Sequence, residues 1–164
     1  MKPVRAVGIQ YAALPYRLAG RRLEVLLLTS RDTGRWVIPK GWPMRGKSPQ
    51  EAAAVEAHEE AGVEGEVAAT PIGSYRYLKA LKSGRQIPVQ VIVFPMRVTA
   101  EADQWKEQAE REKRWLPYRP ASRLVEEPSL RRLIQEWGRS RTPRLFPSTA
   151  RLHGLMKRFG GGLR

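Results

Sequence analysis

The chain has 164 residues, of which 41% are hydrophobic and 28% charged, a composition typical of one globular domain with a sizeable core. It contains no cysteine, which excludes a disulfide framework, a thiolate metal site and a cysteine nucleophile. Thirty lysines and arginines against 16 aspartates and glutamates give a net charge of +14. This charge favours an anionic partner, either nucleic acid or a highly phosphorylated small molecule, although a solubilising basic tail explains part of it.

The N-terminal residues lack a continuous apolar segment after their basic positions. The longest apolar runs are far shorter than the roughly 20 residues of a membrane helix. We therefore expect a cytoplasmic protein without a signal peptide or a membrane partner, and no feature indicates an obligate protein partner.

The chain begins with two predicted strands. Residues 4–14 (VRAVGIQYAAL) have strand-forming character and are followed by a turn marked by Pro15 and Gly20. Residues 23–29 (LEVLLLT) are almost continuously apolar, which favours a strand buried on both faces; the run is too short for a buried helix.

A turn, a short strand and a basic loop come next. Residues 30–35 predict the turn and residues 36–38 (WVI) the strand. Residues 40–47 then form a loop with two glycines and three cations, which can surround a phosphate group with backbone and positive charge.

The following segment predicts a helix with both ends marked. Ser48 and Glu51 have the spacing of a capping box, and Pro49 occupies the first helical position. Gly62 follows the last helical residue, where a left-handed backbone is favoured.

Three carboxylates share one face of this helix. Glu56, Glu59 and Glu60 fall on an arc of about 100° at helical spacing. The pair Glu56 and Glu60, one turn apart, costs roughly 0.2–0.5 kcal/mol unless a cation neutralises it. Oxygen ligands of this kind suit a hard cation such as Mg2+. The alternative is a solvated acidic face.

Three further strands are predicted at residues 65–70, 72–81 and 86–98, with a hairpin connection at residues 82–85. The last of these (QIPVQVIVFPMRV) has the strongest strand pattern in the chain. We expect Pro88 and Pro95 to mark its ends or a bulge.

The C-terminal third is predicted to be helical. Residues 101–114 are highly charged and form either a short helix or a long loop, and residues 120–127 and 129–137 predict helices. Leu130, Leu133, Ile134 and Trp137 form a stripe that we expect to pack on the sheet. From Gly138 on we expect a loosely held basic tail with a short helix at residues 152–159, so the domain is placed at residues 1–140 and the tail at 141–164. Together the elements predict an α/β or α+β sandwich.

The stretch from Gly41 to Val63 resembles the signature of the Nudix family, Gly-x5-Glu-x7-Arg-Glu-U-x-Glu-Glu-x-Gly-U, in which U is aliphatic. Gly41, Glu56, Glu59, Glu60, Gly62 and Val63 stand at matching positions, and Ala57 is a small substitute at the first aliphatic one. The preceding WVIPKG also resembles the family's strand and loop. The resemblance implies an α/β/α sandwich with a mixed β-sheet between helices.

The resemblance also implies a divalent metal site for Mg2+ or Mn2+ and hydrolysis of a diphosphate bond. Glu56, Glu59 and Glu60 are then metal ligands and catalytic residues, and the base candidate is Glu56 or a metal-bound hydroxide. The carbonyl of Gly41 or Lys40 is the expected further ligand. Family members often take another acidic ligand from a later loop, here one of Glu107, Glu110 and Glu112, whose alternative is solvated loop charge.

Two positions depart from the signature, because Lys47 replaces its first glutamate and Val55 its arginine. These residues commonly pair in the family and brace the loop against the helix. Their joint loss leaves no unpaired arginine behind. We expect a lower rate rather than a lost metal site, and Lys47 can add a phosphate contact.

Beyond the signature, LLTSRDTGRWVIPKGW and REKRW resemble the diphosphoinositol polyphosphate phosphohydrolase branch, which also cleaves diadenosine polyphosphates. The substrate-binding residues implied are Arg31, Arg35, Lys40, Arg85, Arg111 and Lys113. The first hypothesis is therefore a metal-dependent hydrolase of inositol pyrophosphates or dinucleoside polyphosphates.

Two alternatives remain open. The substrate could be the 5′ end of RNA, with Trp42, Tyr75 and Tyr77 as stacking groups, although such residues more often belong to the core. The protein could also be a non-catalytic polyanion-binding protein with a degenerate signature, as Lys47 and Val55 would allow.

Overall fold

The computed structural model describes residues 8–145, which form one mixed sheet and three helices. The strands are β1 (Gly8–Ala19), β2 (Arg22–Thr29), β3 (Trp36–Val37), β4 (Lys40–Gly41), β5 (Val63–Val67), β6 (Gly73–Ala80), β7 (Gln86–Glu101) and β8 (Lys113–Pro117). The helices are α1 (Pro49–Ala61), α2 (Tyr118–Leu124) and α3 (Pro128–Leu145). None of these helices is long and apolar enough to cross a membrane.

The sheet is built around the long strands β1 and β7, which pair in parallel from Gly8 and Val89 to Tyr16 and Arg97. The main path of the sheet is β3-β2-β1-β7-β5, and β4, β6 and β8 pair with β1, β7 and β2. All pairings other than β1 with β7 are antiparallel. The predicted mixed sheet is thus confirmed.

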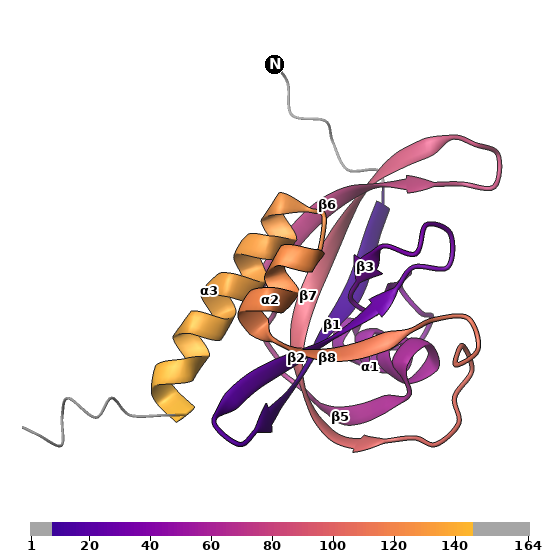
Figure 1. Cartoon of the computed structure of the whole chain (residues 1–164). Coiled ribbons are helices and arrows are strands. Elements are labelled where there is room, and N and C mark those ends of the chain that lie inside the picture. Colours follow the sequence, from indigo (N-terminus) through magenta and orange to yellow (C-terminus); the bar gives the residue numbers. More distant parts are fainter. Residues whose placement is uncertain (1–7, 146–164) are drawn as a thin grey trace, which may run out of the picture.

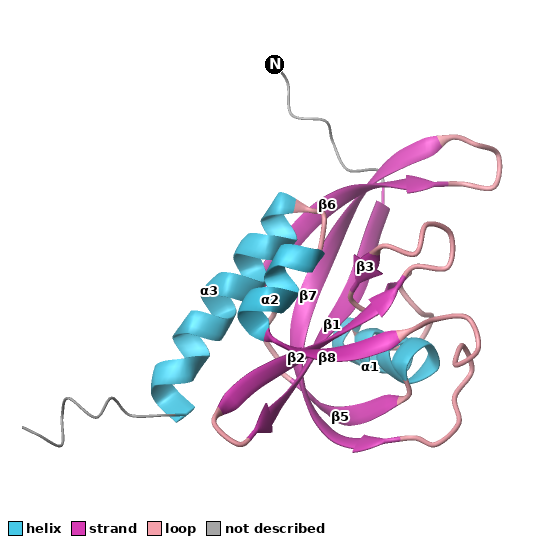
Figure 2. Ribbon diagram, in the orientation of Figure 1, coloured by secondary structure: helices cyan, strands magenta, loops and turns pink. Residues whose placement is uncertain are grey.

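Helices cover both faces of the sheet (Figure 1). α2 and α3 lie side by side over one face, and α1 lies on the other. Figure 2 shows the same three layers coloured by secondary structure, with the helices on the two sides of the strands. This arrangement confirms the predicted α/β/α sandwich.

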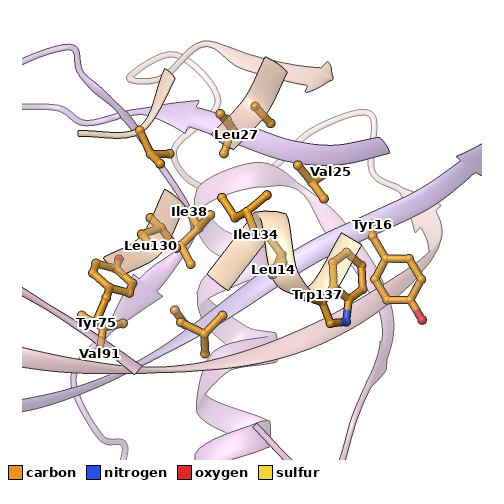
Figure 3. Close-up of a cluster of buried hydrophobic side chains, with 14 of the residues drawn as sticks. Leu14, Tyr16, Val25, Leu27, Ile38, Tyr75, Val91, Leu130, Ile134 and Trp137 are labelled. Carbon is orange, nitrogen blue, oxygen red and sulfur yellow. The ribbon is translucent and has the colours of Figure 1, made fainter. Parts of the chain in front are cut away.

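Each face of the sheet has its own hydrophobic core. Between the sheet and α2 and α3, aliphatic and aromatic side chains interdigitate, among them Leu14, Val91, Ile134 and Trp137 (Figure 3). On the other face, buried alanines of α1 such as Ala53 and Ala57 pack against larger side chains of the sheet, including Leu26 and Phe94. Because alanines are small, the axis of α1 lies close to the sheet.

Prolines within the long strands lie where a strand changes partner. The pairing of β1 with β4 ends at Ala12 and its pairing with β2 begins at Tyr16, so Pro15 falls in the gap. Pro95 likewise lies between the part of β7 that pairs with β6 and the part that pairs with β5. A residue without an N–H is tolerated at such breaks. The expected turn at Pro15 is therefore wrong. Pro95 marks neither an end of β7 nor the register shift of its pairing with β5, which lies at Glu64 and Gly65.

Two further expectations about the C-terminal half are settled. Within residues 101–114, positions 102–112 form a loop with turns and no helix. α3 continues past Gly138 to Leu145, so the first residues of the predicted tail are helical. The short helix predicted at residues 152–159 lies outside the described residues.

Candidate active site

A polar cleft of about 720 Å³ opens beside the C-terminal half of α1. Its walls come from α1, from β4 and the loop after it, from the turn after β2, from β6, and from the loop before β8. Four segments far apart in the sequence thus meet the helix that carries the acidic residues.

Helix α1 supplies the carboxylates because both of its ends are fixed. The Ser48 hydroxyl accepts a hydrogen bond from the Glu51 N–H at 3.1 Å, and the Glu51 carboxylate accepts one from the Ser48 N–H at 2.9 Å. Gly62 ends the helix with a left-handed backbone, φ 66°. The predicted capping box and glycine C-cap are confirmed. The alanine face of the helix is buried, so Glu56, Glu59 and Glu60 line the cleft.

Glu60 is the most buried of these carboxylates, with 8% of its surface exposed. Burial raises the pKa of Glu60 to about 8, and the nearby Arg111 guanidinium opposes this rise. Burial also raises the pKa of Glu56, opposed by a side-chain hydrogen bond with Glu60. Without a strong counter-charge, the pair therefore retains a proton well above the usual range of a carboxylic acid.

Gly41 makes room for the Glu56 carboxylate. A Cβ atom on Gly41 would lie 2.1 Å from Oε1 of Glu56, far inside van der Waals contact. The backbone of β4 at this point is held by its pairing with Tyr11 of β1. A glycine is therefore required for this carboxylate to reach the backbone.

Cations from the loop before β8 face the acidic residues. Nη2 of Arg111 lies 3.5 Å from Oε1 of Glu60 and 3.1 Å from Oε1 of Glu107. Arg111 is anchored by a hydrogen bond from Nη1 to the Thr29 carbonyl at 3.1 Å. Nζ of Lys106 lies 3.6 Å from Oε2 of Glu59. The loop and the helix thus form one network of charges.

A second group of cations surrounds Tyr77. Nζ of Lys40 lies 5.1 Å from the centre of the Tyr77 ring, and the Arg35 guanidinium lies 5.8 Å from it. The Tyr77 hydroxyl donates to Oε1 of Gln10 at 2.7 Å. Burial lowers the pKa of Lys40 to about 8; Glu60 opposes this shift, and the charges of Arg35 and Lys79 add to it.

The cleft continues past Tyr77 into an adjoining cavity of about 500 Å³. Lys40, Tyr77 and Lys79 line both spaces, and Arg35 lines the second. An extended anionic molecule can therefore contact both groups of cations at once.

The donor set of this cleft fits a hard divalent ion. It offers carboxylate oxygens from Glu56, Glu59 and Glu60 and a backbone carbonyl at Gly41, all ligands that Mg2+ and Mn2+ prefer. Burial is the main cause of the raised pKa values of Glu56 and Glu60, and the lysines and arginine nearby only partly oppose it. Within residues 8–145, no three acidic or histidine side chains stand close enough to hold an ion as placed. Instead, Lys106 and Arg111 partly offset the charge.

Most of the predicted site residues meet in this cleft. Its lining includes Gly41, Glu56, Glu59, Glu60, Arg31, Lys40 and Arg111. Of the three later glutamates, Glu107 and Glu110 also line it, and both lie near Nη1 of Arg31, at 3.2 and 3.6 Å. Glu112 instead forms backbone hydrogen bonds to Thr29.

The other predicted phosphate-binding cations lie elsewhere. Arg35 lines the adjoining cavity, with Nη1 2.6 Å from Oε1 of Glu127. Arg85 is exposed in the turn between β6 and β7. Nζ of Lys113 lies 3.1 Å from Oε1 of Glu101 and 4.2 Å from the centre of the Trp105 ring, outside the cleft. The geometry does not bring Arg85 or Lys113 to the carboxylates.

Two cations of the cleft, Lys79 and Lys106, are not among the phosphate contacts that the sequence predicts. Lys79 stands two positions after Tyr77 and so shares its face of β6, and this spacing is the sequence signal that places it in the cleft. No pattern in the sequence predicts that Lys106 lies in the cleft, because its position depends on how the loop before β8 folds. The aromatic residues predicted as stacking groups differ in their exposure. Tyr75 is buried in the core, whereas Trp42 lines the cleft with 41% of its surface exposed.

Neither of the two residues that depart from the signature lines the cleft. Lys47 is exposed, and its N–H donates to the Met44 carbonyl in a turn. Val55 is half-buried and lines an apolar groove with Val63 and Met96. In this chain the capping box of α1, rather than an ion pair, joins the loop to the helix.

Comparison with known proteins defines the class. The family model described as NUDIX domain matches residues 10–137, and the chain therefore belongs to the Nudix family. It is 31% identical over 119 residues to Nudix hydrolase 12, mitochondrial, of Arabidopsis thaliana, which covers 71% of this chain and 59% of the relative. It is 28% identical over 109 residues to mouse diphosphoinositol polyphosphate phosphohydrolase 3-alpha, which covers 65% of this chain and 62% of the relative. The matches span about six-tenths of these relatives' length.

Solved structures agree on the fold. A binary complex of the C. elegans Ap4A hydrolase has a TM-score of 0.60 at 19% identity and covers 80% of this chain and 95% of that one. The NUDIX domain of Shewanella oneidensis NrtR, solved with ADP ribose, has a TM-score of 0.61 at 17% identity and covers 85% and 91%. At such identities the likeness supports the fold alone.

Proposed function

We propose that this protein is a divalent-metal-dependent hydrolase of phosphoanhydride bonds in highly phosphorylated small molecules. The observation that carries the proposal is the cleft itself. Glu56, Glu59 and Glu60 form an acidic wall, and lysines and arginines from four other segments stand around it. Such a cleft can bind a cation and a polyphosphate together.

In this proposal the acidic residues bind the metal ion and the basic residues bind the phosphates. Glu56, Glu59 and Glu60, with the carbonyl of Gly41, would hold Mg2+ or Mn2+. When bound, such an ion lowers the pKa of a water ligand and neutralises charge on the diphosphate.

The cations of the chain bind and orient the phosphates. Lys106 and Arg111 stand at the acidic wall, and Arg31 lines the same cleft beside Glu107 and Glu110. Lys40 and Lys79 lead past Tyr77 to the adjoining cavity. Fixed positive charge in a partly closed site also stabilises charge that develops on the phosphoryl oxygens.

We propose diphosphoinositol polyphosphates or dinucleoside polyphosphates as substrates, acted on in the cytoplasm. The two connected cavities suit a molecule with several phosphates. Relatives are named as a diphosphoinositol polyphosphate phosphohydrolase and an Ap4A hydrolase. Several plant relatives carry mitochondrial or chloroplastic names, so location needs a direct test with a tagged chain.

The 5′ end of RNA is a second candidate substrate, supported by Trp42. Its ring packs against Gly8, where a Cβ atom would lie 2.8 Å from the ring. Because the ring is supported from behind and exposed to the cleft, it offers a stacking surface for a base. An inositol substrate would not use such a surface in this way.

A panel of substrates tests the assignment. The protein is incubated with Mg2+ and an inositol pyrophosphate, a diadenosine polyphosphate, a triphosphorylated RNA or ADP-ribose, and released phosphate or nucleotide is measured. Turnover of one class identifies the substrate. Tight binding of a phosphorylated compound with no turnover of any would instead support a non-catalytic polyanion-binding protein.

The Glu60→Gln variant tests the acidic wall. The substitution removes one negative charge and little volume, so we expect turnover to fall at least 100-fold while circular dichroism stays unchanged. Glu66→Gln is the matched control, because Glu66 lies on the surface and pairs with Arg97. Wild-type turnover in Glu60→Gln would refute the role given to Glu60.

A further inference from the structure

The outer side of α2 and α3 carries a basic groove that the proposed hydrolase does not use. The two helices approach closely at Gly138, where a Cβ atom would lie 2.2 Å from the Tyr118 ring. A hydrogen bond from Nε2 of Gln135 to the Ser122 hydroxyl at 3.2 Å joins the helices at a second point. The groove between them is thus a fixed feature of the helix pair.

Three arginines converge on this groove, which has a volume of about 200 Å³. Arg119 and Arg123 come from consecutive turns of α2, and Arg139 comes from α3. All three side chains are exposed. Glu126 and Glu127, which follow Arg123, are engaged with Arg35. Glu136, three residues before Arg139 in α3, is exposed and is in no ion pair of the described residues. Among the described residues, no ion pair neutralises any of the three guanidiniums.

Such an arrangement has a physical cost without an anion. Like charges one turn apart on a helix destabilise it by a few tenths of a kcal/mol, and the third guanidinium adds to the repulsion. A phosphoryl group would relieve this cost, because its oxygens match the planar fork of guanidinium donors. The Tyr118 hydroxyl accepts a hydrogen bond from Nε of Arg119 at 3.1 Å and so orients that side chain.

We propose that this groove binds a phosphoryl group through Arg119, Arg123 and Arg139. The site is separate from the cleft: the two share no lining residue, and α2 and α3 cover the sheet face opposite to α1. The proposal therefore does not depend on the hydrolase function.

The backbone of single-stranded RNA is the favoured source of this phosphoryl group. Arg139 begins a stretch in which residues 139–164 contain seven lysines and arginines and no aspartate or glutamate. The sequence from Arg139 onward is therefore basic, and a run of positive charge along the chain suits a chain of phosphates better than a single one. A free phosphorylated small molecule is the other source of the same chemistry.

Binding of a fluorescent ten-nucleotide RNA to the full chain tests the proposal. The measurement is fluorescence anisotropy in EDTA, which removes divalent ions and so prevents metal-dependent hydrolysis. We expect the triple variant Arg119→Gln, Arg123→Gln, Arg139→Gln to bind at least tenfold more weakly. The slope of log affinity against log salt should also fall by about 2, since each lost contact to single-stranded nucleic acid removes about 0.7.

A charge-matched variant separates a local site from the general attraction of a basic protein. Arg21 and Lys82 are exposed in the turns after β1 and β6, and Arg22 is exposed at the start of β2. The joint change of the three to Gln removes the same charge. We expect this variant to lose less than threefold in affinity. Equal losses in both variants, or none in the groove variant, would overturn the proposal.

Inorganic phosphate provides a test that needs no substitution. Its titration into the wild-type chain should shift the NMR signals of the Gln135 side-chain amide and the Arg119 guanidinium. If phosphate shifts these signals and RNA does not compete with it, the natural ligand is a small phosphorylated molecule. If neither ligand shifts them, the groove is not a phosphate site. The KM of the groove variant for a small phosphoanhydride should stay unchanged, which keeps this test independent of the hydrolase.

Discussion

At Glu60, burial and charge act in opposite directions. The side chain is held in the cleft with 8% of its surface exposed, and burial favours its neutral form. Arg111 and Lys40 favour the charged form, but they leave its pKa near 8. If Glu60 binds the divalent ion proposed above, that ion must compete with a proton at neutral pH.

This competition predicts a pH-dependent metal affinity. Below a pKa of about 8, each pH unit lowers the ionised fraction of Glu60 tenfold, so we expect the Kd for Mn2+ to rise about tenfold per unit from pH 8 to pH 6. Above pH 8 the Kd should level off. Isothermal titration calorimetry across this range measures the effect, and a Kd independent of pH would contradict it.

The metal-free protein should show the reverse trend in stability. The pKa of Glu60 is higher in the folded than in the unfolded chain, so its neutral form contributes stability below about pH 4.5 that is lost as pH rises through about 8. Glu60→Gln stays neutral and serves as the control. Its free energy of unfolding relative to the wild type should rise between pH 5 and pH 8.

At the level of the element, α1 is the part that the sequence predicts most fully. Its start at Ser48, its end at Gly62 and its acidic face all depend on residues a few positions apart. Such local rules need no knowledge of the rest of the fold. The same helix carries the predicted carboxylates, so the acidic wall could be foreseen along with the element.

The capping box predicts a measurable contribution to stability. Ser48→Ala removes the hydroxyl that accepts from the Glu51 N–H, and we expect the free energy of unfolding to fall by about 1 kcal/mol. Urea denaturation measures it. Glu51→Ala breaks the same box, so the double variant should lose less than the sum of the two single losses. Additive losses would mean that the two hydrogen bonds do not act together.

Features that depend on distant segments could not be predicted from the sequence. Pro95 resembles a strand end, yet β7 continues through it because the strand exchanges β6 for β5 at that point. Lys113 is only two positions after Arg111 in the same basic cluster. Arg111 still belongs to the loop before β8, whereas Lys113 begins the strand and reaches Glu101 and the Ala61 carbonyl instead of the cleft. The sequence predicts the sign of each charge in this cluster. The orientation of each side chain depends on how the loop before β8 folds against other segments.

In the molecule as a whole, the α1 layer and the α2–α3 layer contribute different surfaces. The α1 layer presents the carboxylates, and the α2–α3 layer closes the other core and carries the basic groove. The two cores are separated by the sheet. Loss of packing in one layer should therefore affect the cleft differently from the same loss in the other.

A pair of large-to-small substitutions tests this separation. Leu130 of α3 is 1% exposed in one core and Phe94 of β7 is 3% exposed in the other, beside the alanines of α1. Leu130→Ala and Phe94→Ala should each lower the free energy of unfolding by about 3–4 kcal/mol, since each leaves a cavity. Under conditions where both variants are folded, Phe94→Ala should weaken Mn2+ binding several-fold, because α1 loses the surface that positions Glu56 and Glu60. Leu130→Ala should bind Mn2+ as the wild type does. Equal weakening in both variants would show that the sheet transmits strain between its faces and that the layers do not act independently.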